Sequence, residues 1–307
     1  MSVTPITWLW AGFVAVMGVM MVLDLGIFNK KAHVMSVREA GVMVGIWWAL
    51  AAAFALAVYF VYGHDKAFQF VSAYILEQSL SVDNLFVFIL VFTFFGIGPE
   101  EQPRVLHWGI LGAIAMRFIF IFAGLSLLEA SHMMFYVFGA ILVFTGAKML
   151  FSGDEQMDPA KNPALKLLHK FLPVTQGLHG HKFFTRIDGV LHATPLFAAL
   201  VVIEGTDLIF AVDSIPAALG VSSDLFVVYT SNIFAVMGLR SMYFLLAGSM
   251  SEFKYLKTGV SAVLVFVGVK MIAKDWYHVS TGHSLLVIGG VLVLSIVASI
   301  AARKKHA

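Results

Sequence analysis

The segment Glu204-Gly-Thr-Asp-Leu-Ile-Phe-Ala-Val-Asp-Ser-Ile-Pro-Ala217 places three carboxylates inside a run of mainly apolar residues at 195–219. A second segment, Glu77-Gln-Ser-Leu-Ser-Val-Asp-Asn84, lies in a similar run at 68–96. Both runs are long enough to cross a bilayer as helices. A charged residue near the bilayer centre costs about 2.5–3.5 kcal/mol on insertion scales, so such residues are rare and usually functional. The two segments predict a membrane protein with a buried cluster of carboxylates.

The composition of the whole chain agrees with a membrane protein. Of the 307 residues, 60% are hydrophobic and 12% are charged, which is about half the charged share of a soluble domain. Mean hydropathy is +0.90, so lipid must be the solvent for much of the chain. The near balance of 20 basic and 18 acidic residues argues against a nucleic-acid partner. Because cysteine is absent, disulfides and thiolate metal sites are excluded.

The predicted fold class is an all-α membrane protein, a single transmembrane domain over 1–307 with about nine spans. About 20 helical residues cross a hydrocarbon core of ~30 Å. The first apolar run has no basic n-region and no small-residue cleavage site, so we expect it to be retained as a span. The nine predicted spans are 6–28, 39–62, 68–96, 105–129, 133–151, 195–219, 225–248, 257–274 and 283–302.

Basic residues in the connections predict the orientation of the chain in the membrane. Almost all of them fall in one set of connections, and the opposite set holds only Lys66 and Lys274. Because connections rich in Lys and Arg stay in the cytoplasm, we expect the N-terminus outside and the C-terminus in the cytoplasm. The expected location is the inner (plasma) membrane.

The one sizeable segment outside the predicted spans is 152–194, which we expect to form a cytoplasmic loop. Residues 163–172 within it have the pattern of a short amphipathic helix at the membrane interface. The His-Gly-His at 179–181 has ligands for a metal, although loop histidines are usually only solvated. The histidines of this loop are His169, His179, His181 and His192.

Two parts of the chain resemble each other in sequence. Val82-Asp83-Asn84 aligns with Val212-Asp213-Ser214, and the same alignment places Glu77 over Asp207. Further along, Leu142-Val-Phe-Thr-Gly-Ala-Lys-Met149 matches Leu264-Val-Phe-Val-Gly-Val-Lys-Met271. The anchors occur in the same order, so we interpret them as an internal repeat rather than as chance similarity of apolar sequence.

The repeat units are predicted at 68–151 and 195–274, with three spans each. Between the aligned segments each unit has one arginine inside a span, Arg117 or Arg240. Because three spans separate equivalent positions, the second unit enters the membrane from the opposite side. Inverted repeats of this kind form many secondary transporters, with the substrate site near the midplane. Duplication for packing alone would not need a carboxylate pair in both units.

The acids within the predicted spans outnumber the fixed cations beside them. We interpret Arg117 and Arg240 as counter-ions, with Lys148 and Lys270 nearer the span ends. The surplus negative charge then requires protons, a diffusible cation or both. Asp24 is a secondary candidate for the site. It lies near the end of its span, where its side chain can instead snorkel to the interface or cap the helix. The acids in the spans are Asp24, Glu77, Asp83, Glu204, Asp207 and Asp213.

The other candidate ligands in the two segments are also oxygen atoms. There is no thiol and no histidine in either segment. A site made only of oxygen suits Mg²⁺, Ca²⁺ or Mn²⁺ rather than zinc or copper, and the ligands do not choose among the three. Besides the acids, the ligands are the amide of Asn84 and the hydroxyls of Ser79, Ser81, Thr206 and Ser214.

Helical geometry limits which of these acids share an ion. Residues six apart on a regular helix are about 120° apart around the axis and ~9 Å apart along it. Glu77 and Asp83 therefore cannot share an ion on an unbroken helix, whereas Glu204 and Asp207, three apart, share a face.

Pro216 is predicted to break the second helix and to free the carbonyl of Val212. Gly205 is predicted to be another weak point. Irregular backbone of this kind lines cation sites in transporters.

The sequence contains no motif of an intramembrane enzyme. It has no His-Glu-x-x-His, no Gly-x-Gly-Asp and no glycine-rich nucleotide loop with its lysine. A Thr-Val-Gly-Tyr-Gly filter is also missing, so a potassium-type channel has no support. We expect a protein that is not an enzyme and has no prosthetic group.

The two acidic segments resemble the signature segments of the TerC family of membrane proteins, including its Alx-type members. The resemblance covers nearly the whole chain, with one departure at Gly205-Thr206, where Leu-Ser is frequent. It implies export of manganese from the cytoplasm, with Mn²⁺ as the transported ion. The metal ligands that the resemblance implies are Glu77, Asp83, Asn84, Glu204, Asp207, Asp213 and Ser214.

The leading hypothesis is an Mn²⁺ exporter with protons as the coupling ion. One alternative is a membrane scaffold that does not transport and that assists the metalation or assembly of exported proteins. Another is an exporter of Ca²⁺ or Mg²⁺.

Overall fold

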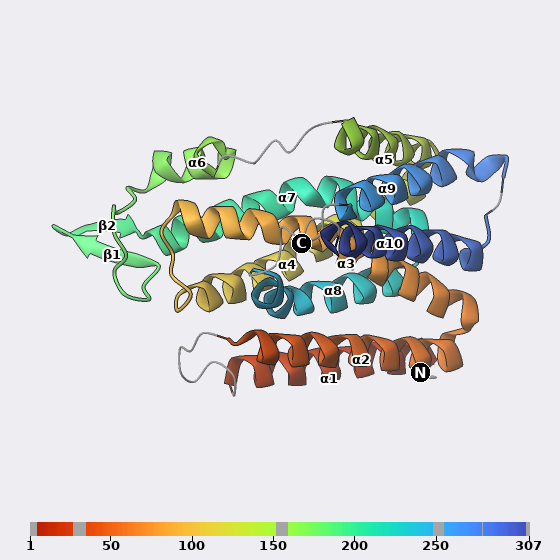
Figure 1. The fold of residues 1–307 in the computed structure, drawn as a ribbon, viewed down its shortest axis with the longest axis horizontal. Helices are drawn as coiled ribbons and strands as arrows, with labels where there is room; N and C mark the ends of the chain where they lie inside the picture. Colours follow the sequence, from red (N-terminus) through yellow and green to blue (C-terminus); the bar gives the residue numbers. More distant parts are fainter. Residues whose placement is uncertain (1–4, 27–34, 152–158, 248–254, 278, 305–307) are drawn as a thin grey trace.

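The computed structural model describes residues 5–26, 35–151, 159–247, 255–277 and 279–304. These residues are mostly helical, as predicted, and the longest helices run roughly alongside one another (Figure 1). The helices are α1 Pro5–Gly26, α2 Val37–Tyr62, α3 His64–Phe94, α4 Gln102–Ala130, α5 Met133–Phe151, α6 Pro163–Phe171, α7 Pro195–Val221, α8 Leu225–Leu246, α9 Leu256–Ile272 and α10 Thr281–Lys304. Two short strands, β1 Phe184–Ile187 and β2 Val190–Ala193, and 3₁₀ turns at Pro159–Lys161 and Ala273–Asp275 complete the described elements.

Eight helices of the described chain are long and apolar enough to cross a membrane: α2 to α5 and α7 to α10, with α9 extended to Asp275. Nine spans were predicted; the described apolar stretch of α1, Ile6–Val22, is shorter than the others. Large apolar side chains cover the outside of the bundle, and Phe60, Phe144 and Phe151 are each at least 69% exposed. Such a surface is unfavourable in water and suits lipid. The chain is therefore an integral membrane protein.

Local sequence explains where several helices begin. Ser36 caps α2 through a capping box with Glu39, in which each side chain bonds the backbone of the other. Asn162 caps α6, and Asp224 caps α8 by accepting from the N–H groups of Phe226 and Val227. These side chains satisfy amide groups that have no partner within their helix.

The centre of the bundle is α8, in which almost every side chain is buried. It packs against α2, α3 and α4, while α7 packs against α3 and α4. On one side of this centre α5 and α9 lie against each other, and on the opposite side α1 lies along α2 (Figure 1). Polar residues on α3, α7 and α8 therefore face other helices rather than lipid, as expected for charged groups in a membrane.

The contact between α5 and α9 is close because small residues lie at it. A Cβ atom at Gly139 would be 2.8 Å from the backbone oxygen of Gly268, and one at Gly146 would be 2.8 Å from that of Ser261. Small residues allow helix backbones to approach in this way within a membrane.

The predicted break of the second acidic helix is wrong. Helix α7 runs without interruption from Pro195 to Val221, with Pro216 inside it. Proline removes one hydrogen bond to the carbonyl of Val212, but the bonds on either side and the packing of this buried end of α7 keep the backbone helical. The backbone is also helical at Gly205. A Cβ at this position would lie 2.7 Å from the Cβ of Ala164 on α6. This glycine allows α6 to dock on α7.

The segment between α5 and α7 contains the predicted amphipathic helix. In α6, Leu165 and Leu168 are buried while Leu167 and Phe171 are exposed. The antiparallel hairpin of β1 and β2 follows it and was not predicted. Its turn, Asp188-Gly189, has φ of 50° and 79°, as a type I′ turn requires. In Figure 1 the hairpin and α6 lie at the same end of the molecule.

Candidate functional site

A buried arginine joins the two acidic segments. Arg117 of α4 contacts the carboxylate of Glu77 on α3, and its Nη2 atom lies 3.3 Å from Oδ1 of Asp207 on α7. The side chains of Arg117 and Glu77 are each 1% exposed, and that of Asp207 is 6% exposed. Glu77 and Asp207 are the residues that the repeat alignment placed over each other, and the fold brings them to one cation. A pair so deeply buried requires good geometry and further hydrogen bonds to offset the loss of hydration.

Two asparagines supply those further hydrogen bonds. Asn232 of α8 donates to Oε2 of Glu77 at 2.9 Å and accepts from Nη1 of Arg117 at 2.5 Å. Asn84 of α3 donates to Oδ1 of Asp207 at 3.3 Å. The site therefore joins four helices, α3, α4, α7 and α8, through five buried polar side chains. Below we call these residues (Glu77, Asn84, Arg117, Asp207 and Asn232) the arginine cluster.

Asn232 was not singled out from the sequence, although a signal was present. The run Thr230-Ser231-Asn232 is polar, and it lies within an apolar span. Polar residues at membrane depth generally face the bundle interior. With Arg117 aligned to Arg240, position 232 corresponds to Gly109, so the repeat gave no indication of it.

Asp213 lies apart from the arginine cluster. Its Oδ1 atom accepts a hydrogen bond from Thr145 of α5 at 2.8 Å, and Lys148 of the same helix provides nearby positive charge. Asp207 meets α4 and Asp213 meets α5, so acids six residues apart point in different directions, as helical geometry predicts. A single ion cannot contact both in this arrangement.

Glu204 and Ser214 also lie on α7, on either side of Asp207 and Asp213 along the chain. Oε1 of Glu204 and the hydroxyl of Ser214 are buried and have no hydrogen bond among the described residues. Glu204 is packed so closely against Gly112 of α4 that a Cβ at that glycine would overlap its carboxylate. On α3, Oε1 of Gln78 and the hydroxyl of Ser81 are likewise buried and without a partner in the described chain. Four oxygen atoms on the two acidic helices therefore remain available to a ligand.

Two predicted site residues have side chains outside the described residues. These are Asp24 on α1 and Asp83 on α3. Whether Asp83 and Asp213, which the repeat aligns, contribute to one metal site therefore stays a prediction. The second predicted counter-ion, Arg240 on α8, is 3% exposed.

The arrangement holds an internal cation rather than an open metal site. Within the ranges that the structure describes, no three acidic or histidine side chains come close enough to hold a metal ion. The guanidinium of Arg117 occupies the space between Glu77 and Asp207. For those two carboxylates to bind a metal, Arg117 must move away from at least one of them.

Comparison with known proteins gives consistent matches along the chain. Residues 62–307 match the model of a family described as integral membrane protein TerC family. An uncharacterized membrane protein of Myxococcus xanthus is 46% identical over 299 residues, covering 97% of this chain and 93% of the relative. A Salmonella typhi protein named "Putative membrane-bound redox modulator Alx" is 40% identical over 303 residues, covering 96% and 94%. Its namesake in Escherichia coli K12 is 38% identical over 312 residues, covering 99% and 97%. No solved structure matches the chain.

Proposed function

The chain belongs to the TerC family of integral membrane proteins, and on that premise we propose that it exports a divalent metal ion, Mn²⁺, from the cytoplasm in exchange for protons. The observation that carries this proposal is the buried contact of Arg117 with both Glu77 and Asp207. Carboxylates from two separate helices converge on one positive charge where lipid would otherwise exclude them.

Arg117 serves in this proposal as a tethered substitute for the transported ion. When no metal is bound, its guanidinium neutralises Glu77 and Asp207 and keeps the two helices together. An arriving cation competes for the same oxygen atoms, and Arg117 is displaced toward Asn232 and the rest of α8. The unpartnered oxygens of Ser81, Glu204 and Ser214 provide further ligands once the helices shift.

The packing of the helices supports the inverted repeat that this mechanism needs. Under the alignment of Leu142 with Leu264, Gly146 corresponds to Gly268 and Gly139 corresponds to Ser261. The contact of Gly139 with Gly268 therefore has its equivalent in the contact of Gly146 with Ser261. Similarly, α3 packs on α8 as α7 packs on α4. Such pairing is what a pseudo-two-fold axis between units 68–151 and 195–274 would produce.

The identity of the metal rests on ligand chemistry and on family resemblance. All the candidate ligands are oxygen atoms, which fits Mn²⁺, Mg²⁺ or Ca²⁺. Several relatives are named as redox modulators. This chain has no cysteine for thiol–disulfide exchange. Control over the amount of a redox-active metal such as manganese is one route by which a protein without thiols would act on redox balance.

The direction of transport determines the need for coupling. In living cells the interior is negative relative to the outside. The potential then draws a cation inward, at about 2.3 kcal/mol per charge for each 100 mV. Export therefore requires an energy source, and carboxylates that exchange a metal for protons would supply the coupling.

Purified protein in proteoliposomes tests the proposal directly. We expect Mn²⁺ movement that a pH gradient accelerates. Asp207→Asn should slow it by about tenfold or more, because it removes an acid of the arginine cluster. The double variant Asp83→Asn with Asp213→Asn should also slow it. Asp188→Asn, in the exposed hairpin turn, is the matched control and should transport normally. No Mn²⁺ flux in the wild-type protein, or equal flux in Asp207→Asn and Asp188→Asn, would refute export by this site.

The same assay separates the alternatives. Stronger competition by Ca²⁺ or Mg²⁺ than by other ions would assign a different cargo. A scaffold predicts no flux in purified protein and binding to a partner through 152–194. Deleting that whole segment is a poor test, because Asn162 bonds Thr206 at 3.2 Å and α6 docks against Gly205. Substituting the exposed hairpin residues Val190 and Leu191 changes the loop and leaves α7 undisturbed.

A further inference from the structure

A cavity of about 240 Å³ opens at the end of the bundle where α7 ends. It lies between the starts of α3, α5 and α10 and the ends of α7 and α9. Three lysines line it: Lys66 from α3, Lys270 from the last turn of α9, and Lys274 from the turn that follows. We call this the lysine cavity. It lies apart from the arginine cluster and shares no residue with it.

The basic residues of this side of the membrane are concentrated in the cavity. In the sequence, Lys66 and Lys274 are the only basic residues in this set of connections. Both line the same cavity, although more than 200 residues separate them. Lys270 adds a third charge from within a span. A scattered pattern of surface lysines would not bring all three to one place.

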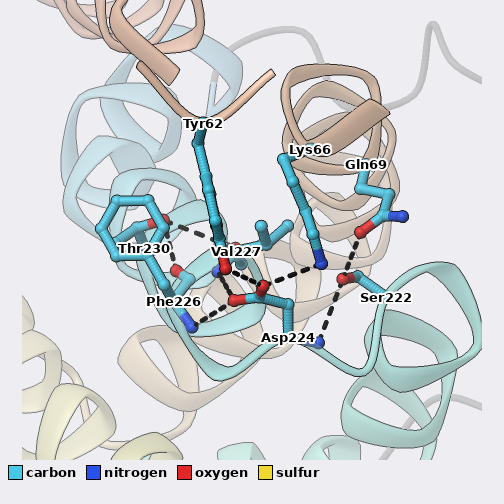
Figure 2. A network of polar contacts seen from close by, with 8 residues as sticks. All are labelled: Tyr62, Lys66, Gln69, Ser222, Asp224, Phe226, Val227 and Thr230. Carbon is cyan, nitrogen blue, oxygen red and sulfur yellow. Dashed lines mark hydrogen bonds and ion pairs between the residues drawn. The ribbon is translucent and has the colours of Figure 1, made fainter. Parts of the chain in front are cut away.

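The contacts of the lysines leave positive charge free to act on a ligand. Lys66 pairs with Asp224 at 2.8 Å, as Figure 2 shows. Nζ of Lys274 lies 3.5 Å from the centre of the Phe135 ring. Lys270 has no ion pair or hydrogen bond with any residue that the structure describes. One of the three charges is thus neutralised by a carboxylate, and two remain.

The nearby acids do not cancel this surplus. Asp224 is fully engaged by Lys66, by Tyr62 at 2.6 Å and by the backbone at the start of α8 (Figure 2). The carboxylate of Asp275 accepts a hydrogen bond from the hydroxyl of Tyr136 at 2.5 Å and lies 3.4 Å from Nε2 of His132. Asp275 does not line the cavity.

Neutral donors complete the lining. The cavity is bordered by Ser222, Ser223 and Thr281. The hydroxyl proton of Ser222 is already donated to Gln69 at 2.6 Å (Figure 2), so the hydroxyl donors for a ligand are those of Ser223 and Thr281. Thr281 is the first residue of α10, and the start of a long helix adds partial positive charge. Lysine together with hydroxyl and helix N-terminal donors is the usual chemistry for binding phosphate.

A simpler reading is that Lys270 and Lys274 only compensate the negative end of α9. That reading does not account for Lys66, which comes from another helix, or for the open space between the three. Because a water molecule takes about 30 Å³ in the liquid, the cavity has room for a tetrahedral anion and several waters.

We propose that the lysine cavity binds a phosphate-type oxyanion, either as a free ion or as the headgroup of an anionic lipid. The bound anion neutralises Lys270 and Lys274. It thereby removes a repulsion that a divalent cation would otherwise meet at this end of the bundle. The site does not depend on the arginine cluster, so its test needs no metal.

Equilibrium dialysis of radiolabelled phosphate against the purified full chain in an uncharged detergent tests the free ion. The double variant Lys270→Gln with Lys274→Gln should weaken binding by about tenfold or more. Lys270→Arg should keep most of it. Lys170→Gln, in the last turn of α6 and exposed, is the control and should bind like the wild type. If the double variant fails to elute as a folded protein, Lys270→Gln alone is used, with a smaller expected loss.

A second measurement distinguishes the lipid source. Native mass spectrometry of protein extracted from membranes rich in phosphatidylglycerol counts the lipids that each variant retains. Weak phosphate binding together with loss of retained lipid in the Lys270 variants would assign the site to a headgroup. If the wild type neither binds phosphate nor retains more anionic lipid than the Lys270 variants, the proposal is overturned.

Discussion

Nη2 of Arg117 lies 3.3 Å from Oδ1 of Asp207, across the boundary between the two predicted repeats. The same guanidinium contacts Glu77, so one positive charge on α4 is shared by acids on α3 and α7. Two carboxylates and one arginine leave one net negative charge within the bundle. The stability of each of these buried charged groups therefore depends on the presence of the others.

That dependence predicts a specific pattern of loss and rescue. Arg117→Met should destabilise the protein by about 3–5 kcal/mol, because it leaves buried carboxylates without their partner. Adding Glu77→Gln and Asp207→Asn should restore most of the thermal stability in detergent, since the unpaired charges are removed, while Mn²⁺ flux stays absent. Arg186→Gln on the exposed hairpin is the control. A triple variant no more stable than Arg117→Met would show that the arginine is not the counter-ion of these acids.

Asn232 should matter for transport as much as for stability. Asn232→Leu removes the donor to Oε2 of Glu77 and the acceptor of Arg117. A buried polar group left unsatisfied costs about 1–3 kcal/mol, so a lower melting temperature and slower flux are both expected. Ser231→Ala next to it removes a hydroxyl that bonds only the backbone of its own helix. Melting curves that are the same for the two variants would contradict the assigned role.

The close contact of α5 with α9 predicts two equivalent sites of sensitivity. Gly139→Ala and Gly146→Ala each place a Cβ 2.8 Å from a backbone oxygen of α9, so the helices must separate. Overpacking of this kind costs about 1–3 kcal/mol. Gly289→Ala on α10 meets nothing within 4 Å and is the matched control. Thermal unfolding in detergent measures all three, and an effect at only one of the α5 positions would argue against the pseudo-symmetric packing.

The sequence was most informative about charged residues in apolar spans, because their free-energy cost in lipid requires a partner. Charged residues in apolar runs must find partners, so Arg117 was expected to lie beside buried acids, and the structure shows it between Glu77 and Asp207. The spans followed from length and hydropathy, and α6 followed from its apolar face. These features depend on strong, local patterns.

The features that were missed depend on tertiary context. Pro216 carries a local signal for a break, but the packing around α7 keeps the helix continuous. A glycine within a helix is a local signal for a weak point, whereas Gly205 provides room for Ala164 of α6. The strands of the hairpin have four residues each, too few to give a reliable alternation. Asn232 is neutral and has no counterpart in the repeat. The continuity of α7 and the role of Gly205 depend on which helices touch, whereas the polar run 230–232 and the turn Asp188-Gly189 are weak local signals.

Asp224 provides a prediction about pH at the end of the bundle away from α6. Burial raises the pKa of Asp224, but hydrogen bonds from Lys66 and Tyr62 and the charge of Lys66 outweigh it, and the pKa lies below its ordinary value. A carboxyl group whose pKa is lowered by folding stabilises the protein above its unfolded pKa of about 3.9 and loses this contribution as pH falls through the folded value.

Asp224→Asn keeps a residue able to cap α8 and removes only the charge. At pH 7 it should cost about 1 kcal/mol or less, because solvent screens a partly exposed pair. Melting temperatures of the variant and the wild type should then approach each other progressively as the pH falls below about 4 and through the lowered pKa of Asp224. Asp65→Asn, which alters an exposed acid on the first turn of α3, should leave the melting temperature unchanged. A gap between wild type and Asp224→Asn that did not narrow at all as the pH fell below 4 would mean that the carboxylate stabilises this end through something other than its charge.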